Sequence, residues 1–291
     1  MQKTGRGRLR VGVHTSIAGA IENAVLRASE IGCDTFQMFS ANPRGWRTSD
    51  PSYEECERFR TERAARKLSP LVIHDNYLIN LASGDSEIRR KSVAAFRREI
   101  QRALALDADY LVAHPGSSRG STVSAAIANC IESLKEAANG LCLDGLMVLV
   151  ENTAGQGSAI GRSLEEVAEI VSGAGKDLPV GACMDTAHLF AAGYSVHTAS
   201  GLGKTIEEIE GTVGLERVRV IHANDSKVAF NSHVDRHEHI GKGQIGAEAF
   251  GRIVRHPKLC DIPFICETPV DRPDDDKRNL AMMRRLAARR A

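Results

Sequence analysis

The histidines and carboxylates of this 291-residue chain recur in one setting, directly after short apolar runs. Seven of eight such runs are followed by one of them: His14, His74, His114, Glu151, Asp185, His222 and Glu267. Imidazole and carboxylate together form the ligand set that suits zinc, manganese or iron. A single histidine in this setting is usually a hydrogen-bonded structural residue, but seven such positions together predict a metal centre.

Two local spacings add further candidate ligands. Asp185 and His188 form a D-x-x-H pattern, and residues three apart share one face of a helical turn. Asp235 and His237 form D-x-H, and residues two apart point the same way in extended chain. Apart from His14, the candidate ligands are then His74, His114, Glu151, Asp185, His188, His222, Asp235, His237 and Glu267. One metal usually takes three or four protein ligands, so this set predicts two or three metals that share a carboxylate, equipment typical of phosphate-ester hydrolysis.

The apolar runs indicate the elements that position these residues. The runs lie at 9–13, 35–39, 71–73, 110–113, 147–150, 180–184, 218–221 and 263–266. Amphipathic stretches typical of helices lie between them at 20–31, 53–66, 88–106, 125–138, 164–171 and 247–254. Apolar strands that alternate with helices predict a parallel sheet covered on both faces. Eight such units fit an α/β fold of one (β/α)8 TIM-barrel domain, with the metal site at the C-terminal face of the strands.

Composition sets the limits of this interpretation. The chain has 38 Lys and Arg against 37 Asp and Glu, a net charge of +1, which argues against binding nucleic acid by bulk charge but leaves room for a local basic patch. No apolar run approaches the roughly 20 residues that span a bilayer. Seven cysteines without a CxxC motif argue against a disulfide framework. We expect a basic extension at 1–9, a barrel at 10–291 that ends in a closing helix, and a cytoplasmic monomer with no membrane association.

Longer motifs point to a family. They include HDNYLINL at 74–81, VENTAGQGS at 150–158, MDTAHLFAAGY at 184–194 and VDRHEHIGKGQIG at 234–246. Together with FSANPRGW at 39–46, they run through nearly the whole chain in a fixed order. In these motifs the chain resembles the endonuclease IV family, the zinc-dependent apurinic/apyrimidinic (AP) endonucleases of base-excision repair.

The resemblance implies a cluster of three zinc ions per chain. Residues that match His74, His114 and Glu151 hold the first zinc in this family. The second is held by the matches of Glu151, Asp185, His222 and Glu267, so that Glu151 bridges, and the third by the matches of His188, Asp235 and His237. All nine positions carry a competent ligand here. Mn²⁺ or Fe²⁺ also suits some of these sites, and His14 is expected to orient a ligand or a phosphate.

The resemblance also implies a reaction. The expected activity is hydrolysis of the phosphodiester 5′ to an abasic site in double-stranded DNA, which leaves a 3′-hydroxyl and a 5′-deoxyribose phosphate, with trimming of 3′ ends as a further activity. Glu151 and Glu267 are the expected catalytic residues, which fix and help to deprotonate a metal-bound nucleophile, while the third zinc stabilises the leaving oxygen. A nucleoid-associated location follows from this activity, and no obligate protein partner is expected.

Two loops carry the expected DNA contacts. An abasic nucleotide leaves a gap in the base stack, and flat or long side chains are suited to filling it. Arg44, Tyr77 and Leu78 match positions that the family uses to penetrate the helix, and Asn42 and Lys227 are candidate phosphate contacts. Without the family motifs, the same residues would be interpreted as a solvated cation and an ordinary loop anchor.

Two other functions compete with this hypothesis. A xylose-isomerase-like sugar isomerase or epimerase would have the same barrel and a His/carboxylate metal site. It needs only one or two metals, which leaves His188, Asp235 and His237 without an evident purpose. A noncatalytic binder of DNA lesions would be favoured if ligands were missing, and none is.

Overall fold

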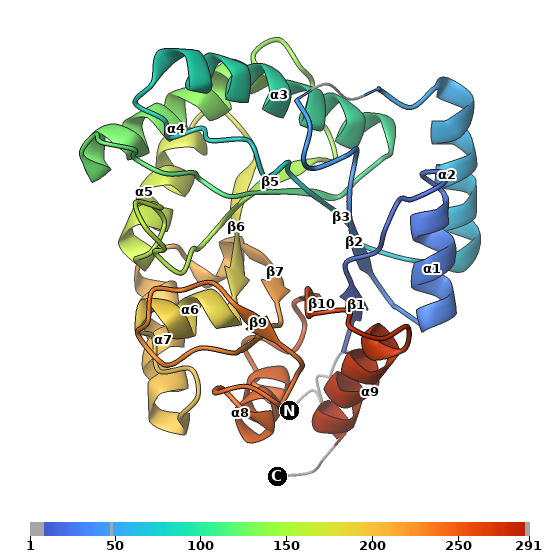
Figure 1. The fold of residues 1–291 in the computed structure, drawn as a ribbon, viewed down its shortest axis with the longest axis vertical. Coiled ribbons are helices and arrows are strands. Elements are labelled where there is room, and N and C mark those ends of the chain that lie inside the picture. Colours follow the sequence, from blue (N-terminus) through green and yellow to red (C-terminus); the bar gives the residue numbers. More distant parts are fainter. Residues whose placement is uncertain (1–8, 47–48, 289–291) are drawn as a thin grey trace, which may run out of the picture.

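A parallel barrel forms the centre of the structure, a computed structural model that describes residues 9–46 and 49–288. Its strands are β1 (Val11–Val13), β2 (Phe36–Phe39), β3 (Leu71–His74), β4 (Tyr110–Ala113), β5 (Met147–Glu151), β6 (Val180–Asp185), β7 (Val218–His222) and β10 (Phe264–Cys266). They pair in the order β1-β10-β7-β6-β5-β4-β3-β2, with every pairing parallel. In Figure 1 these strands lie in the middle and the helices surround them.

The barrel closes between β1 and β2 through a short contact. His14 and Gln37 form an isolated parallel bridge, and the amide of Thr15 donates to the carbonyl of Gln37 at 2.7 Å. Gly12 makes this approach possible, because a Cβ at that position would lie 1.8 Å from the carbonyl oxygen of Thr35. The predicted (β/α)8 barrel is therefore confirmed.

Helices follow the strands and form the outer layer (Figure 1). They are α1 (Asn23–Ile31), α2 (Tyr53–Arg66), α3 (Ser86–Ala105), α4 (Val123–Ala138), α5 (Leu164–Ala174), α6 (Thr186–Ala192), α7 (Ala199–Gly211), α8 (Ala247–Arg255) and α9 (Asp275–Ala288). Side-chain caps define several starts. Ser52 and Glu55 form a capping box at α2, and Asp85 and Thr122 cap α3 and α4. A small hairpin of β8 (Asp225–Ser226) and β9 (His237–Glu238) lies outside the barrel.

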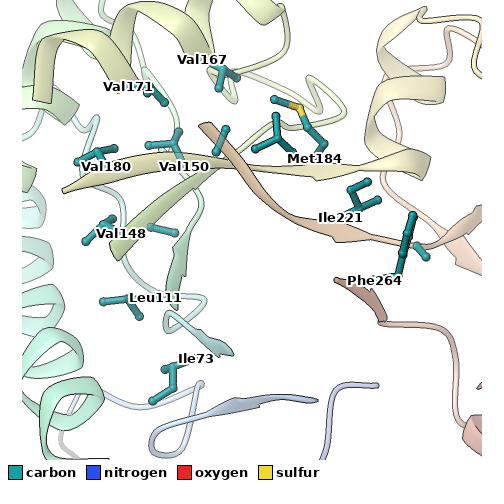
Figure 2. Packing of buried hydrophobic residues seen from close by; sticks show 14 of the residues in the cluster. Ile73, Leu111, Val148, Val150, Val167, Val171, Val180, Met184, Ile221 and Phe264 are labelled. Carbon is teal, nitrogen blue, oxygen red and sulfur yellow. The ribbon is translucent and has the colours of Figure 1, made fainter. Parts of the chain in front are cut away.

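Buried side chains form two separate layers. The larger one fills the space between strands and helices, and Figure 2 shows part of it, including Ile73, Leu111, Val148 and Val167. The smaller one fills the barrel interior. Its fully buried members are Val72, Val112, Leu149, Cys183, Val220 and Ile265. Residues that alternate along a strand therefore face the helices and the barrel interior in turn.

The two ends of the described chain lie close to the barrel strand β1. Of the expected extension at 1–9, only Leu9 lies in the part of the chain that the structure describes. The closing helix is present as α9, beside β1. Across 9–46 and 49–288 no helix combines the length and the apolar character that crossing a membrane requires. All seven cysteines are free thiols.

Candidate metal centre

The two-residue period of the strands places the candidate ligands. Each ligand follows a residue of the interior layer by two positions along its strand, so both side chains point into the barrel and the ligand lies closer to the C-terminal end. Val72 precedes His74 in this way, and Leu149 precedes Glu151. The same relation links Val112 to His114, Cys183 to Asp185, Val220 to His222 and Ile265 to Glu267. Six ligands therefore form the next interior layer, at the C-terminal mouth of the barrel.

The first group of ligands is His74, His114 and Glu151. One ligand atom from each lies within 4.8 Å of the others. The Nε2 atoms of His74 and His114 lie 3.2 Å and 3.3 Å from Glu151 Oε2. The other ring nitrogen of His74 lies 3.0 Å from the carbonyl oxygen of Asp75, so the nitrogen that faces Glu151 is fixed in direction.

The second group shares Glu151 with the first. It contains Glu151, Asp185, His222 and Glu267, again with ligand atoms within 4.8 Å of one another. His222 Nδ1 lies 3.0 Å from Glu151 Oε1 and 3.1 Å from Glu267 Oε2. Glu151 thus presents its two oxygens to different groups, the geometry of a bridging carboxylate.

The third group brings α6 and β9 to the same mouth. His188 and His237 lie within 4.8 Å of Asp185, which also belongs to the second group. Asp235 lies between the two imidazoles, with its oxygens 3.2 Å from His188 Nε2 and 3.2 Å from His237 Nε2. Both Nε2 atoms are buried without a hydrogen-bond partner among the described residues. Two buried nitrogens of this kind, aimed at one carboxylate, fit a shared cation.

The charges of the site depend on one another. Burial by itself raises the pKa of Glu151, but the charges of His222 and His114 hold it well below its usual range. Burial lowers the pKa of His188, whereas the neighbouring carboxylates of Asp185 and Asp235 bring it well above the usual range. Burial also lowers the pKa of His237, but the carboxylates of Asp185 and Asp235 raise it to about 9. The buried carboxylates therefore require positive charge beside them, which protonated imidazoles or metal cations can supply.

Three buried amide side chains, which no motif in the sequence predicted, hold the ligands in place. Gln37 Nε2 donates to Glu267 Oε1 at 2.5 Å, and Gln37 Oε1 lies 2.8 Å from His222 Nε2. Asn224 Nδ2 donates to Asp185 Oδ2 at 2.6 Å, and the amide of Glu267 donates to Asn224 Oδ1 at 2.8 Å. Asn152 fixes the start of α6 through its Oδ1, which accepts from the amide of Asp185 at 2.7 Å.

His14 lies at the edge of this network. Its Nδ1 is 3.1 Å from Gln37 Nε2 and 3.8 Å from Glu267 Oε1, and its ring packs 4.4 Å from the ring of Phe39, centroid to centroid. Burial lowers its pKa, which favours the neutral imidazole. His14 is thus placed to orient Glu267 and lies outside the three ligand groups.

A cleft of about 810 Å³ opens above the ligands. His74, His114, His188, Asp235, His237 and Glu267 line its floor and walls, together with Tyr77, Leu78 and Trp46. Tyr77 is 65% exposed and Trp46 is 42% exposed, so both present aromatic surface to solvent.

The two loops with expected DNA contacts are tied together. Asn76 Nδ2 donates to the carbonyl of Gly45 at 2.9 Å, and the amide of Tyr77 donates to the carbonyl of Pro43 at 3.2 Å. The Tyr77 ring also packs edge-on against Phe39, with centroids 5.1 Å apart. This arrangement gives the exposed Tyr77 ring a fixed base on the barrel.

The other expected DNA contacts lie outside the cleft lining. Asn42 and Arg44 are exposed on the loop after β2, where the amide of Arg44 donates to Asn42 Oδ1 at 3.1 Å. Lys227 is exposed after β8, and its amide donates to the carbonyl of Arg236 at 2.9 Å. These exposed side chains can contact a ligand that extends beyond the cleft.

A fourth histidine–carboxylate group, His239, Asp271 and Asp275, lies at the start of α9. Asp275 accepts from the backbone amides of Asp271 and Arg272 at 3.1 Å and 2.7 Å and pairs with Arg278 at 3.1 Å. The carboxylate is therefore already engaged in ordering the turn that begins the helix.

Comparison with known proteins places the chain in a family. The family described as xylose isomerase-like TIM barrel matches residues 25–286. A protein of Solibacter usitatus described as a probable endonuclease 4 is 51% identical over 281 residues, which cover 96% of this chain and 97% of that protein. The probable endonuclease 4 of Methanoculleus marisnigri is 44% identical, with 95% and 98% of the two chains covered.

Solved structures agree with this result. The crystal structure of endonuclease IV from Thermus thermophilus is similar, with a TM-score of 0.84 and 39% identity over 95% of this chain and 98% of that one. A D-tagatose 3-epimerase-like protein, at 20% identity and a TM-score of 0.70, shares the fold alone. The chain therefore belongs to the endonuclease IV family of metal-dependent hydrolases, as its sequence motifs predict.

Proposed function

We propose that this chain is an AP endonuclease that hydrolyses the phosphodiester on the 5′ side of an abasic nucleotide in double-stranded DNA. The products are a 3′-hydroxyl and a 5′-deoxyribose phosphate. The observation that carries the proposal is that three ligand groups adjoin beneath one open cleft. The first and second share Glu151, and Asp185 of the second lies within 4.8 Å of His188 and His237 of the third.

We assign three zinc ions to this centre. His74, His114 and Glu151 hold the first, Glu151, Asp185, His222 and Glu267 the second, and His188, Asp235 and His237 the third. The donor set fits zinc because it combines imidazole nitrogens with carboxylates. The unpartnered Nε2 atoms of His188 and His237 support the third site. Divalent ions in such a centre lower the pKa of bound water and neutralise charge on phosphoryl and leaving oxygens.

The two glutamates have different surroundings and therefore different roles in the proposal. Glu151 is fully buried among four histidines, so its charge serves to hold the ligand groups together. Glu267 lines the cleft, and Gln37 and Asn224 fix the direction of its carboxylate. We assign to Glu267 the positioning of the attacking water and the acceptance of its proton.

The loops above the cleft supply selectivity for a missing base. Tyr77 and Leu78 lie where an aromatic ring and an aliphatic side chain can enter the gap that the missing base leaves. The abasic sugar, which has little stacking to lose, then moves toward the ligands. Arg44, Asn42 and Lys227 meet the surrounding phosphates. The same cleft, open on one side, would accept a blocked 3′ end, so 3′-end trimming is part of the proposal.

The test is cleavage of a 5′-labelled duplex that carries one tetrahydrofuran abasic analogue. The holoenzyme is assayed before and after prolonged chelation, and after zinc is returned. We expect one cut directly 5′ to the analogue, loss of cleavage on chelation, and recovery with zinc. Glu267→Gln, assayed together with its metal content, should lose most of the turnover.

Two results would overturn the proposal. A chain loaded with metal that leaves the abasic duplex intact would instead be a lesion binder, which a gel-shift with the same duplex would detect. A chain that leaves DNA intact and epimerises a ketose would support the sugar-epimerase function of its structural neighbours. Near-normal turnover by Glu267→Gln would refute the role given to that residue.

A further inference from the structure

We propose that Arg119, on the wall of the cleft formed by the loop after β4, binds a backbone phosphate of the DNA duplex. This inference rests on the proposed function, because it assumes that DNA enters the cleft. It assigns a binding role to a loop that carries none of the expected DNA contacts and that does not include a metal ligand beyond His114.

Arg119 is an arginine of the cleft wall that has no side-chain partner among the described residues. Among the described residues, the Lys and Arg side chains that line it are Lys91 and Arg119. Lys91 Nζ forms an ion pair with Glu87 Oε1 at 2.6 Å. Arg119 is exposed, and its guanidinium has no hydrogen bond or ion pair within the described part of the chain. Its five donors are therefore available to a ligand in the cleft.

The loop that carries Arg119 is built to a fixed shape. Asn80, a buried residue, accepts from the amide of Ser117 at 2.9 Å and donates to the Ser117 carbonyl at 3.1 Å. Gly116 allows this contact, since it has φ of 102° and a Cβ there would lie 2.2 Å from Asn80 Oδ1. The turn at Arg119 thus starts from an anchored backbone.

A second set of contacts joins this loop to the one after β5. Ser117 and Ala159 form an antiparallel bridge, and the amide of Ser118 donates to the carbonyl of Ser158 at 2.9 Å. Arg119 itself has φ of 38°, in the left-handed region that favours glycine. This conformation is common in tight turns, and residues 119 and 120 form one here, which places Arg119 at the tip of the loop.

The charge of the cleft explains why a cation is needed on this wall. Asp235 and Glu267 line the floor, and DNA carries about one negative charge per 1.7 Å of duplex. The planar guanidinium of arginine matches a phosphate with two parallel hydrogen bonds. Tyr77 and Trp46 lie on the loops after β3 and β2, and Arg119 lies on the loop after β4, so a duplex that enters the cleft has support beyond the stacking loops.

The experiment measures binding of the holoenzyme to an undamaged 30-base-pair duplex by fluorescence anisotropy, as a function of salt. The variants are Arg119→Gln, Arg119→Lys and the control Arg217→Gln, an exposed arginine in the turn before β7, at the opposite end of the barrel. Arg119→Gln should bind about tenfold more weakly near 50 mM salt, and the slope of log K against log salt should fall by about one. Arg119→Lys should keep the wild-type slope.

Cleavage of the abasic duplex supplies a second readout. With Arg119→Gln, the enzyme concentration for half-maximal single-turnover cleavage should rise about as much as the dissociation constant, while the saturating rate stays at the wild-type value. Wild-type salt slope and affinity in Arg119→Gln, or an equal loss in Arg217→Gln, would overturn the inference. If the wild-type chain does not cleave DNA, the proposed function fails, but the binding comparison still decides the role of Arg119.

Discussion

Gln37 offers a sharp test of how the ligands are held. Its side chain is fully buried and contacts Glu267, His222 and His14 at 2.5, 2.8 and 3.1 Å. Gln37→Leu keeps a similar shape and removes all three hydrogen bonds. His222 is then left buried with an unsatisfied ring nitrogen, whereas Glu267, with 18% of its side chain exposed, can recover a bond to water. The expected cost is about 2–4 kcal/mol in the metal-free chain, because each buried group left unpaired costs roughly 1–3 kcal/mol.

The assay is thermal unfolding of metal-free and zinc-loaded protein, with zinc affinity measured by competition with a chelator. For a chain of this size the loss corresponds to a decrease in Tm of roughly 4–8 °C. Removal of a group that orients metal ligands typically lowers metal affinity or activity by about 10–100-fold. Gln101→Leu, the same substitution on an exposed position of α3, is the control and should leave both quantities unchanged. Wild-type Tm and zinc affinity in Gln37→Leu would refute the reasoning.

Gly12→Ala should destabilise the chain by more than about 3 kcal/mol, because the added Cβ would lie 1.8 Å from the carbonyl oxygen of Thr35. Gly203→Ala in α7, where the added Cβ meets no atom, is the control and should stabilise the chain by up to about 1 kcal/mol. Both changes are measured by denaturant unfolding. In chelated protein, Tm should fall as the pH rises from 6.5 to 9. Folding raises the pKa of His237 to about 9, so its protonated form contributes stability that is complete below the pKa of the unfolded state and is lost above the pKa of the folded state. A Tm that does not change with pH would contradict this. Tyr77→Ala should weaken binding to the abasic duplex about tenfold and change Tm by less than about 1 °C, because this exposed ring contributes more to the complex than to the fold. An equal loss of affinity for undamaged duplex would argue against a role of Tyr77 at the lesion.

The layer of metal ligands could be predicted from the sequence because side chains alternate in direction along each barrel strand. Strand residues two apart point to the same side of the strand. A histidine or carboxylate at the end of an apolar run therefore points into the C-terminal end of the barrel, as His74 and Glu151 do. The strand bounds were recovered to within two residues for the same reason. Short or glycine-containing helices were harder to predict from the sequence. The seven residues of α6 are too few to show a helical period, and α7, which contains three glycines, was not predicted although Leu202, Ile206 and Ile209 follow helical spacing.

The network behind the ligands could not be predicted in the same way. Asn152 and Asn224 act through contacts between residues 33 and 39 positions apart, which no local spacing encodes. Gln37 had one signal, a polar residue in the middle of the apolar run FQMF, and its two-residue relation to Phe39 places it in the barrel interior. A polar residue inside a barrel strand is therefore a useful sign of a group that orients ligands.

The metal content of the purified chain tests the central claim most directly, namely that nine residues build one centre with three ions. Elemental analysis of protein grown with sufficient zinc should give three metals per chain. His237→Ala should give about two, because it removes one ligand of the group that Asp235 and His188 complete. A wild-type chain that binds one metal or none, with correct folding shown by its circular dichroism spectrum, would contradict the account.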